Sequence, residues 1–337
     1  MRTRAGYVLG FMGLLAGVAL QATDTPAPPK CSVLSVPVDR EVTLEVLDWG
    51  GQGRPIVFLA ALGADAHEFD GFATKFTGAH HVYGITRRGF GGSSRPESGY
   101  SNDRLGQDVV AVIESLHLDK PVLVGHSIAG MELSWVGTHH PERVSGLVYV
   151  EAAYGYAYYS EASSDPNNVM LDALELREKL AGLPPGGGRP DQRRLTAELL
   201  ADTARLERGL RDHADMLKDY EDPVVDPSNP PRPPAWLRGI YQGMQKYTAI
   251  NVPVLAIFAL PHSLGDLGDP SVLSKNPAAA AAAEAEDIRR VGSQADALER
   301  GVRSARVVRI PHAAHFIFQT NEQDVLREMN AFLARLP

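Results

Sequence analysis

The sequence predicts an α/β protein with a mostly parallel, doubly wound sheet into which an all-helical segment is inserted. Short apolar runs of the kind that form buried strands alternate with helix-like stretches over most of the chain, which is typical of a parallel sheet covered by helices on both faces. Between residues 154 and 250 this alternation stops, and only helix-like patterns remain, separated by segments rich in proline and glycine. The chain is therefore interpreted as one α/β core with a helical insertion.

The strands and helices are predicted from periodicity and from the turns that bound them. Val42, Leu44 and Val46 alternate with polar residues, as expected of a half-buried strand over residues 42–49. Apolar runs predict further strands at residues 56–60, 81–86, 121–124, 144–150, 252–258 and 305–310. Helices are expected around Phe69, Phe72 and Phe76, which lie at helical spacing, and over residues 105–116, 170–180, 195–217, 236–247, 277–300 and 325–333.

These elements divide the chain into a core and a cap. The core is expected to comprise residues 41–153 and 251–337, and the cap residues 154–250. Residues 23–40 are assigned to an N-terminal arm. The cap has about the size of a small domain.

The first 22 residues have the features of a secretory signal peptide. Arg2 and Arg4 give a positive start, and residues 7–20 form an uncharged stretch of 14 residues. This stretch is shorter than the roughly 20 residues that a membrane-spanning helix needs, so no stable membrane anchor is predicted. Cleavage is expected after Ala22, and the mature protein is expected to be periplasmic or secreted.

Composition excludes several other classes of protein. The 337 residues carry a formal charge of −8 and no basic domain, which argues against nucleic acid as a partner. The single cysteine, Cys31, cannot form an internal disulfide and is interpreted as a spare thiol. No metal or other cofactor is predicted, because the adjacent histidine pairs at 80–81 and 139–140 lack companions at ligand spacing. A small-molecule substrate is the expected partner, and the oligomeric state is left open.

The most informative segment is Gly125-His126-Ser127-Ile128-Ala129. It fits the pattern Gly-x-Ser-x-Gly with alanine in the last position, it follows an apolar strand and it precedes a helix-like stretch. A strand-to-helix elbow of this kind lifts a serine oxygen above the end of a sheet. Ser127 is therefore the candidate nucleophile.

A serine hydroxyl needs a base that removes its proton, and His315 is the candidate for that base. It lies in the loop that follows the last predicted strand, and in a parallel sheet this loop is at the same edge as Ser127. His312, in the same loop, is the alternative.

Together these segments resemble the α/β-hydrolase family, in particular its subgroup with a helical cap. The resemblance rests on residues 125–130, on residues 311–316 and on residues 86–94, which look like the Arg-Gly-x-Gly-x-Ser loop of that family. It implies an oxyanion hole made of the backbone N–H groups of Leu62 and Ile128. The chain departs from many members at Ala60-Ala61, where they have His-Gly and therefore a more adaptable backbone.

The acid that would complete the triad is the second departure. Members of the family usually carry Asp just after the strand predicted at 252–258, but here the first acids beyond it are Asp266 and Asp269. A minority, notably some haloalkane dehalogenases, use a carboxylate at the end of the preceding strand, and Glu151 occupies that position. Glu151 is favoured because its longer side chain suits the longer reach, and Asp266 is the alternative. Such a carboxylate orients the histidine and stabilises its protonated form.

Serine as nucleophile indicates acyl transfer, so the sequence predicts a hydrolase of carboxylic esters or related acyl bonds. Tyr154 and Tyr156, where the cap leaves the core, are candidate substrate-binding residues for a small or medium, largely apolar substrate. Arg87 and Arg88 are interpreted as an ion-paired loop in preference to a site for an anionic substrate. Lactones, amides and carbon–carbon bonds stay open as substrates. The alternatives are a non-catalytic ligand-binding protein on the same scaffold and a lyase that uses the same triad.

Overall fold

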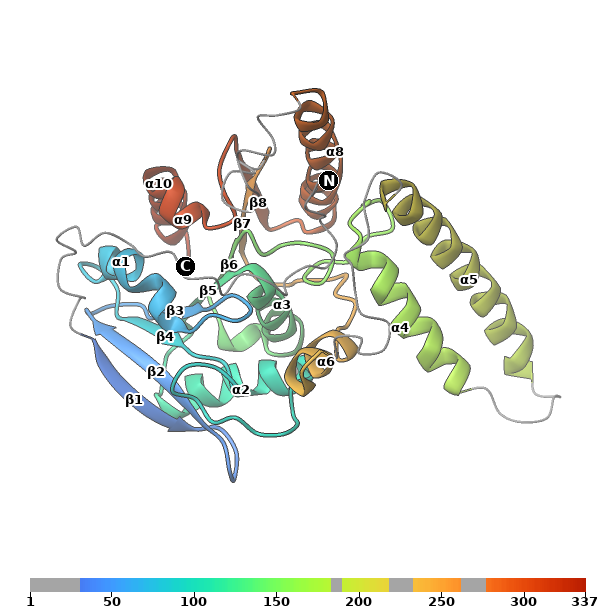
Figure 1. Cartoon of the computed structure of the whole chain (residues 1–337). Helices are drawn as coiled ribbons and strands as arrows, with labels where there is room; N and C mark the ends of the chain where they lie inside the picture. Colours follow the sequence, from blue (N-terminus) through green and yellow to red (C-terminus); the bar gives the residue numbers. More distant parts are fainter. Residues whose placement is uncertain (1–30, 183–189, 218–232, 262–276) are drawn as a thin grey trace, which may run out of the picture.

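The computed structural model describes residues 31–182, 190–217, 233–261 and 277–337 (Figure 1). The predicted signal peptide, residues 1–22, lies outside the described residues. Within the described ranges, eight strands form one sheet in the order β1-β2-β4-β3-β5-β6-β7-β8. The strands are β1 (Ser32–Pro37), β2 (Thr43–Gly50), β3 (Ile56–Leu59), β4 (Val82–Ile85), β5 (Val122–His126), β6 (Gly146–Val150), β7 (Val254–Ala259) and β8 (Ala305–Ile310).

The sheet is mostly parallel, as predicted. Only the pairs β1–β2 and β2–β4 are antiparallel, and β3 to β8 run in the same direction. All parallel strands therefore end at one edge. The chain crosses over between them through helices, which keeps both faces of these strands covered.

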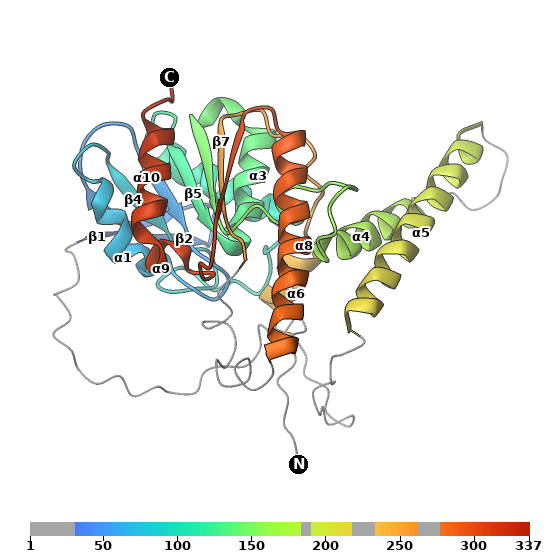
Figure 2. The same cartoon turned by 90° about the horizontal axis from the view of Figure 1, so that it is seen from above.

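Helices cover both faces of the sheet (Figures 1 and 2). The helical elements of the core are η1 (Ala66–Phe69), α1 (Asp70–Ala73), η2 (Thr74–Phe76), α2 (Asn102–Ser115), η3 (Ser127–Ala129), α3 (Gly130–His139), η4 (Pro141–Arg143), α8 (Pro277–Gly301), α9 (Ile317–Thr320) and α10 (Glu322–Leu333). Those of the insertion are α4 (Asn167–Ala181), α5 (Pro190–Leu217) and α6 (Ala235–Gln242).

Alternate residues of each central strand belong to two different hydrophobic cores. Val57 and Leu123 pack in a core with α2, α3 and α8, whereas Phe58 and Val122 pack in a core with α1, α9 and α10. In the second core, Phe58 contacts the three phenylalanines predicted at helical spacing, Phe69, Phe72 and Phe76, with ring centroids 4.9 to 6.2 Å apart. Because successive side chains of a strand point to opposite faces of the sheet, each strand contributes to the cores on both faces.

Part of the predicted N-terminal arm belongs to the sheet. Residues 32–37 form β1, which pairs antiparallel with β2 at the edge of the sheet. Only Val36 of this strand is buried, while Val33 is 61% exposed. An edge strand with so little buried surface has a weak sequence pattern, and this explains why the sequence did not predict it.

All regular secondary structure that the structure describes in the insertion between β6 and β7 is helical. Helices α4 and α5 pack against each other and project from the core (Figures 1 and 2). Helix α6 lies against the core, where the ring of Trp236 meets the ring of Phe90 edge-on, with centroids 5.0 Å apart. The predicted α/β fold class with an all-helical insertion is confirmed.

An ionic network ties the insertion together. Asp172 of α4 is buried and accepts hydrogen bonds from Tyr159 (2.8 Å), from Nε of Arg205 on α5 (3.0 Å) and from Nζ of Lys246 (2.5 Å). Lys246 also lies over the ring of Tyr159, 4.0 Å from its centroid. Because buried charges need partners on every side, this cluster fixes α4 and α5 relative to the turn after β6.

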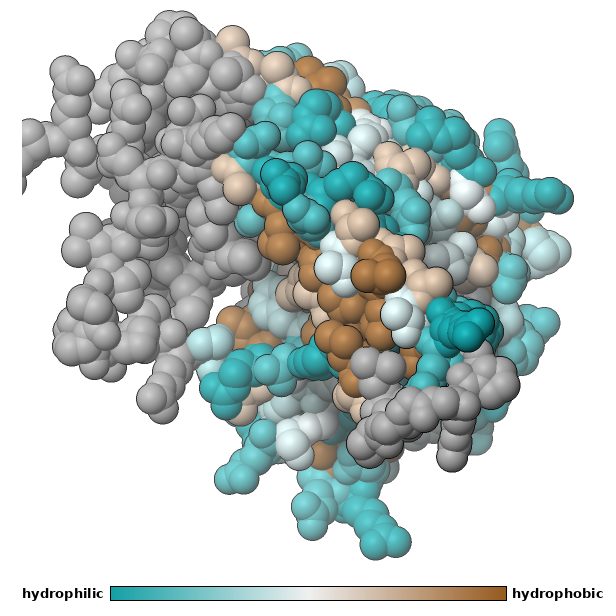
Figure 3. Space-filling model, turned by 90° about the vertical axis from the view of Figure 1, so that its right-hand side faces the viewer, coloured by the Kyte–Doolittle hydropathy of each residue, from teal (hydrophilic) through white to brown (hydrophobic). Residues whose placement is uncertain are grey.

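The surface of the helical hairpin combines polar and apolar residues. Viewed from the side of α4 and α5, apolar residues gather between polar ones (Figure 3). The exposed large apolar residues of these two helices are Leu180, Leu200 and Leu210. Within the described ranges, the helices are all too short or too polar to cross a bilayer.

The network predicts a pH-dependent contribution of Asp202 to stability. Burial raises the pKa of this carboxyl, but Lys179 and Arg205 outweigh burial and hold the pKa below its ordinary value. Its ionised form therefore stabilises the fold above about pH 4, where an unfolded aspartate is charged, and this contribution is lost as pH falls through the lowered folded-state pKa. We expect Asp202→Asn to lower the free energy of unfolding at pH 7, measured with urea, and the difference from wild type to shrink in acid.

The matched control is Glu207→Gln. Glu207 pairs with Arg211 on the exposed side of the same helix, so its removal should change stability little at any pH. A difference for Asp202→Asn that stays constant from pH 7 to pH 3 would contradict this assignment.

Candidate active site

Ser127 occupies a strained elbow at the end of β5. Its φ of 54° lies in the left-handed region, which costs a non-glycine residue about 1–3 kcal/mol and is concentrated at functional sites. The elbow is tight, because a Cβ added at Gly125 would lie 2.8 Å from Cδ1 of Leu133 and 3.1 Å from Cβ of Ala129. The small residues at 125 and 129 therefore permit the sharp turn that presents the serine.

Strand register brings Glu151 beside Ser127. His126 of β5 pairs with Val150 of β6, so the residues that follow, Ser127 and Glu151, leave the sheet side by side. Glu151 also has a left-handed backbone, with φ of 52°, and its side chain is completely buried. Two neighbouring strands thus end in a non-glycine residue in a costly conformation.

The carboxylate of Glu151 connects three parts of the site. Oε1 accepts the backbone N–H of Ala259 at the end of β7 (2.6 Å), and Oε2 accepts the hydroxyl of Tyr154 (2.8 Å). Oε2 also lies 3.3 Å from Nδ1 of His315. Glu151 therefore reaches across to β7, the strand after which many relatives carry their acid.

His315 comes from the loop after β8, and its side chain is 13% exposed. Its ring packs against the ring of His126, the residue before Ser127, with centroids 4.8 Å apart. The structure thus gathers the predicted nucleophile, base and favoured acid at one edge of the sheet. With Nδ1 facing the carboxylate, the other ring nitrogen is the one available for proton transfer.

The alternative base, His312, makes different contacts from those of His315. His312 is exposed, with φ of 54°, and its backbone N–H donates to Pro261. Asp266 and Asp269 lie outside the described residues. Of the two histidines in the loop, it is His315 that meets Glu151.

The two tyrosines predicted to bind substrate contact two of the predicted triad residues, Glu151 and Ser127. Burial and the charge of Glu151 raise the pKa of Tyr154 well above its ordinary value, so its hydroxyl stays protonated and donates to that carboxylate. Tyr156 shares a hydrogen bond with Ser127, and burial followed by the charge of Asp165 raises the pKa of this phenol as well. Both phenols are therefore neutral at any physiological pH.

The loop after β3 contains Leu62, one of the two predicted oxyanion-hole donors. Its preceding peptides are held by buried charges: the carbonyls of Ala60 and Ala61 accept hydrogen bonds from Arg87 (3.0 and 3.3 Å), and the N–H of Ala61 donates to Glu68 (3.0 Å). Ile128, the other predicted donor, directly follows Ser127 and is 6% exposed.

Arg87 and Arg88 form buried ion pairs, as predicted for this loop. Arg87 pairs with Glu132 of α3 and Arg88 with Asp108 of α2, each at 2.6 Å. Burial lowers the pKa of each arginine, but its carboxylate partner outweighs burial and raises it. Both guanidinium groups therefore remain charged and satisfied, which leaves no reason to assign them to an anionic substrate.

Three residues around the candidate site were not predicted from the sequence. Glu68 lies 3.3 Å from Nδ1 of His126, and Nε2 of His126 lies 3.0 Å from the carbonyl oxygen of His315. Glu132 anchors Arg87. A signal existed for Glu132 and His126, since each is a polar residue in an otherwise apolar, buried stretch, but their partners are far away in the sequence.

One group of residues in the described part of the chain could offer ligands to a metal. Cys31, His67 and Asp70 each place one ligand atom within 4.8 Å of the others. His67 and Asp70 are hydrogen-bonded to each other at 2.9 Å, and Asp70 also accepts from Trp49. The group shares no residue with the serine site.

Comparison with known families gives a match over most of the chain. The family described as alpha/beta hydrolase fold matches residues 54–322. This range includes the elbow, the insertion and the histidine loop.

Curated relatives match over shorter segments. The AB hydrolase superfamily protein YisY of Bacillus subtilis is 34% identical over 158 residues, 44% of this chain and 58% of that protein. The non-heme chloroperoxidase of Streptomyces lividans is 33% identical over 40% of this chain and 49% of that protein, and the 3-oxoadipate enol-lactonase 2 of Acinetobacter baylyi is 29% identical over 34% and 43%. The chain spans about half the length of the curated relatives it matches.

Solved structures share the fold over most of the chain. E-2-(acetamidomethylene)succinate hydrolase superposes with a TM-score of 0.53 over 90% of this chain and 100% of that one, at 19% identity. A hydrolase from Pseudomonas aeruginosa PA01 gives a TM-score of 0.54 over 90% and 98%, also at 19% identity. At such identities the likeness concerns the fold alone.

The close packing around the elbow predicts that Gly130→Ala strongly destabilises the protein. Glycine to alanine in a helix normally stabilises. Here, however, a Cβ would overlap the carbonyl oxygen of Ala152 in the turn after Glu151. We expect a loss of about 3 kcal/mol in the free energy of unfolding, measured with urea, because the packed backbone on both sides resists displacement.

Gly71→Ala is the control for this substitution. A Cβ at Gly71 in α1 meets nothing within 4 Å, so the variant should be as stable as wild type or slightly more stable. If both variants unfold at the same urea concentration, the contact between α3 and the turn after β6 is looser than described.

Proposed function

The chain belongs to the α/β-hydrolase family of enzymes, and from that premise we propose that it is a serine hydrolase of carboxylic esters or related acyl bonds. One observation supports this proposal most: a serine with a strained backbone ends β5, and a histidine backed by a fully buried carboxylate lies at the same edge of the sheet. This arrangement matches what nucleophilic catalysis by serine requires.

In the proposed mechanism, the Oγ of Ser127 attacks the carbonyl carbon while His315 takes its proton. The carbonyl oxygen becomes an oxyanion, which the N–H groups of Leu62 and Ile128 stabilise. The carbon–oxygen bond to the leaving group then breaks, and protonated His315 gives its proton to the departing alcohol. Water attacks the acyl-serine by the same steps and releases the acid.

Glu151 is proposed as the acid of the triad. Its Oε2 faces Nδ1 of His315, which orients the ring and stabilises the imidazolium that forms during attack. The hydrogen bonds from Ala259 and Tyr154 keep the carboxylate in place. Tyr156 is hydrogen-bonded to Ser127, so we assign it to the floor of the acyl-binding site.

A small or medium, largely apolar substrate suits the aromatic residues at the junction of insertion and core. Trp236, Phe90 and the tyrosines after β6 are the large side chains there. The name of the Acinetobacter baylyi relative, an enol-lactonase, keeps lactones among the candidate substrates. Export to the periplasm or the medium remains a proposal that rests on the first 22 residues, and cell fractionation tests it.

Ser127→Ala is expected to abolish both hydrolysis and covalent labelling. Wild type should hydrolyse p-nitrophenyl esters of short and medium acyl chains and react with a fluorophosphonate at Ser127, because both reactions need the same activated oxygen. The control is Ser145→Ala, since this serine precedes β6 at the opposite end of the strand and its buried hydroxyl lacks a partner among the described residues. A folded wild type that is neither active nor labelled would instead favour the non-catalytic binding protein.

The assignment of the acid is tested by comparing Glu151→Gln with Asp266→Asn. Replacing the carboxylate by an amide deprives His315 of the charge that stabilises its protonated form, and in a serine protease the analogous change lowers kcat by about 10⁴-fold. We expect Glu151→Gln to lower kcat by at least about 100-fold and Asp266→Asn to lower it less. The reverse ranking of the two kcat values would transfer the role to Asp266.

A further inference from the structure

The loop that carries Leu62 lacks a glycine that many members of the family have at this place. Where many members have His-Gly, this chain has Ala60-Ala61, which restricts the backbone on the approach to the proposed oxyanion donor. A hole works only when its N–H groups point at the developing charge before the reaction begins. Some other feature must therefore hold these peptides in the required orientation.

Buried charges hold both peptide units that precede the N–H of Leu62. In a planar trans peptide, the C=O and N–H groups point in opposite directions. The unit between residues 60 and 61 is fixed at both ends, because its carbonyl accepts from Arg87 and its N–H donates to Glu68. The next unit is fixed at its carbonyl by the same guanidinium, so the N–H of Leu62 points away from Arg87.

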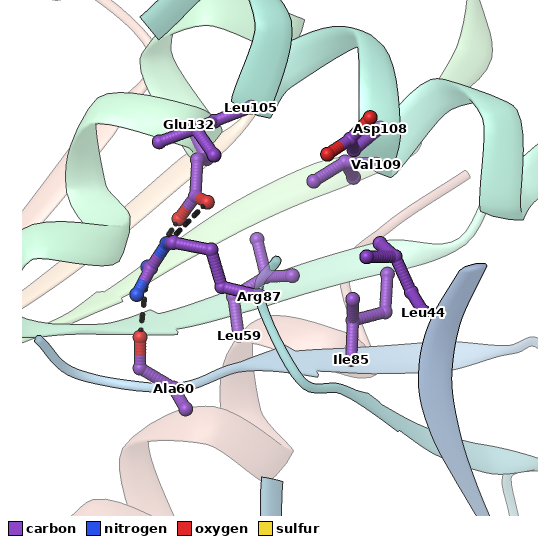
Figure 4. Close-up of a pocket in the computed structure, with 9 residues that line it drawn as sticks. All are labelled: Leu44, Leu59, Ala60, Ile85, Arg87, Leu105, Asp108, Val109 and Glu132. Carbon is purple, nitrogen blue, oxygen red and sulfur yellow. Dashed lines mark hydrogen bonds and ion pairs between the residues drawn. The ribbon is translucent and has the colours of Figure 1, made fainter. Parts of the chain in front are cut away.

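Arg87 is itself held rigidly. Its Nε and one terminal nitrogen donate to the two oxygens of Glu132 at 2.8 and 2.6 Å. Figure 4 shows the guanidinium between this carboxylate and the carbonyl of Ala60, and its second terminal nitrogen donates to the carbonyl of Ala61. It is 5% exposed and makes four hydrogen bonds to these partners. The group therefore cannot swing away from the loop.

The opposite side of the loop has a second anchor. Glu68 holds the N–H of Ala61 and contacts His126, whose other nitrogen lies against the carbonyl of His315. Glu68 and His126 thus connect the loop that carries Leu62 to the loop that carries His315.

We propose that Arg87 is a positioning residue that aims the N–H of Leu62 into the oxyanion hole, with Glu132 and Glu68 as its two supports; this role rests on the proposed serine hydrolase function. The charged hydrogen bond to the carbonyl of Ala61 also polarises that peptide and makes its N–H a stronger donor. In place of a flexible glycine, the chain thus has a loop whose geometry is fixed by its hydrogen bonds with Arg87 and Glu68.

The test compares Arg87→Lys with Arg88→Lys. The two arginines are adjacent and both buried. Arg87 pairs with Glu132 and holds the loop, whereas Arg88 pairs with Asp108 and Asp39 and does not contact the loop. Lysine keeps a cation for the carboxylate in both variants and cannot hold two carbonyls and a carboxylate at once. Folding of both is verified by circular dichroism and thermal unfolding.

Two readouts separate positioning from a merely structural role. Removing a whole oxyanion donor costs about 10²–10³ in kcat, so a misaimed donor in Arg87→Lys should cost about 10- to 100-fold. KM for a p-nitrophenyl ester should stay within about threefold, because the oxyanion develops only in the transition state. A trifluoromethyl ketone, whose adduct with Ser127 carries an oxyanion in the hole, should bind more weakly by the same factor as kcat falls.

Arg88→Lys should leave kcat, KM and ketone binding close to wild type. A folded Arg87→Lys with wild-type kcat and ketone affinity overturns the proposal, as does an equal loss in Arg88→Lys. If Arg87→Lys does not fold, Glu132→Gln replaces it, and wild-type kcat in that variant overturns the proposal equally. Failure of the serine hydrolase function looks different, because wild type itself would then lack both ester hydrolysis and labelling at Ser127.

Discussion

The structure depends on one buried carboxylate. Glu151 is fully buried, and an ionised carboxylate in such a place is very costly unless donors surround it. The backbone of β7, the hydroxyl of Tyr154 and the imidazole of His315 meet this need from three segments that are far apart in the sequence. The same contacts that satisfy the charge therefore bring β6, β7 and the histidine loop to a common point next to Ser127.

Around this point, close packing stabilises backbone conformations that are unfavourable in themselves. Ser127 and Glu151 both adopt left-handed backbones, and such strain persists only where the surroundings over-determine it. Here the surroundings are close contacts: Gly130 lets α3 approach the carbonyl of Ala152, and Gln294 of α8 donates to the carbonyls of Ala153 and Tyr158. The turn after β6 is thus fixed from two helices at once.

Much of the fold and part of the site could be predicted from the sequence, because they depend on local patterns. Apolar runs identify β2 to β8, the elbow motif identifies Ser127, and a carboxylate at the end of β6 identifies Glu151 as the favoured acid. The weak pattern of β1 hid an edge strand. The pairs Arg87–Glu132, Glu68–His126 and His126–His315 could not be predicted, because the residues of each pair are 45, 58 and 189 positions apart and periodicity carries no information about such pairings.

The placement of the helical insertion bears on how this scaffold can change over evolutionary time. The chain leaves the sheet after β6 and returns at β7, two adjacent strands whose alignment is set by their own backbone pairing. Helices α4 and α5 meanwhile find most of their charged partners in each other and in the nearby Lys246. Insertions, deletions or exchange of that hairpin can consequently be accommodated while β6 and β7, and with them Glu151 and its contact to Ala259, keep their places.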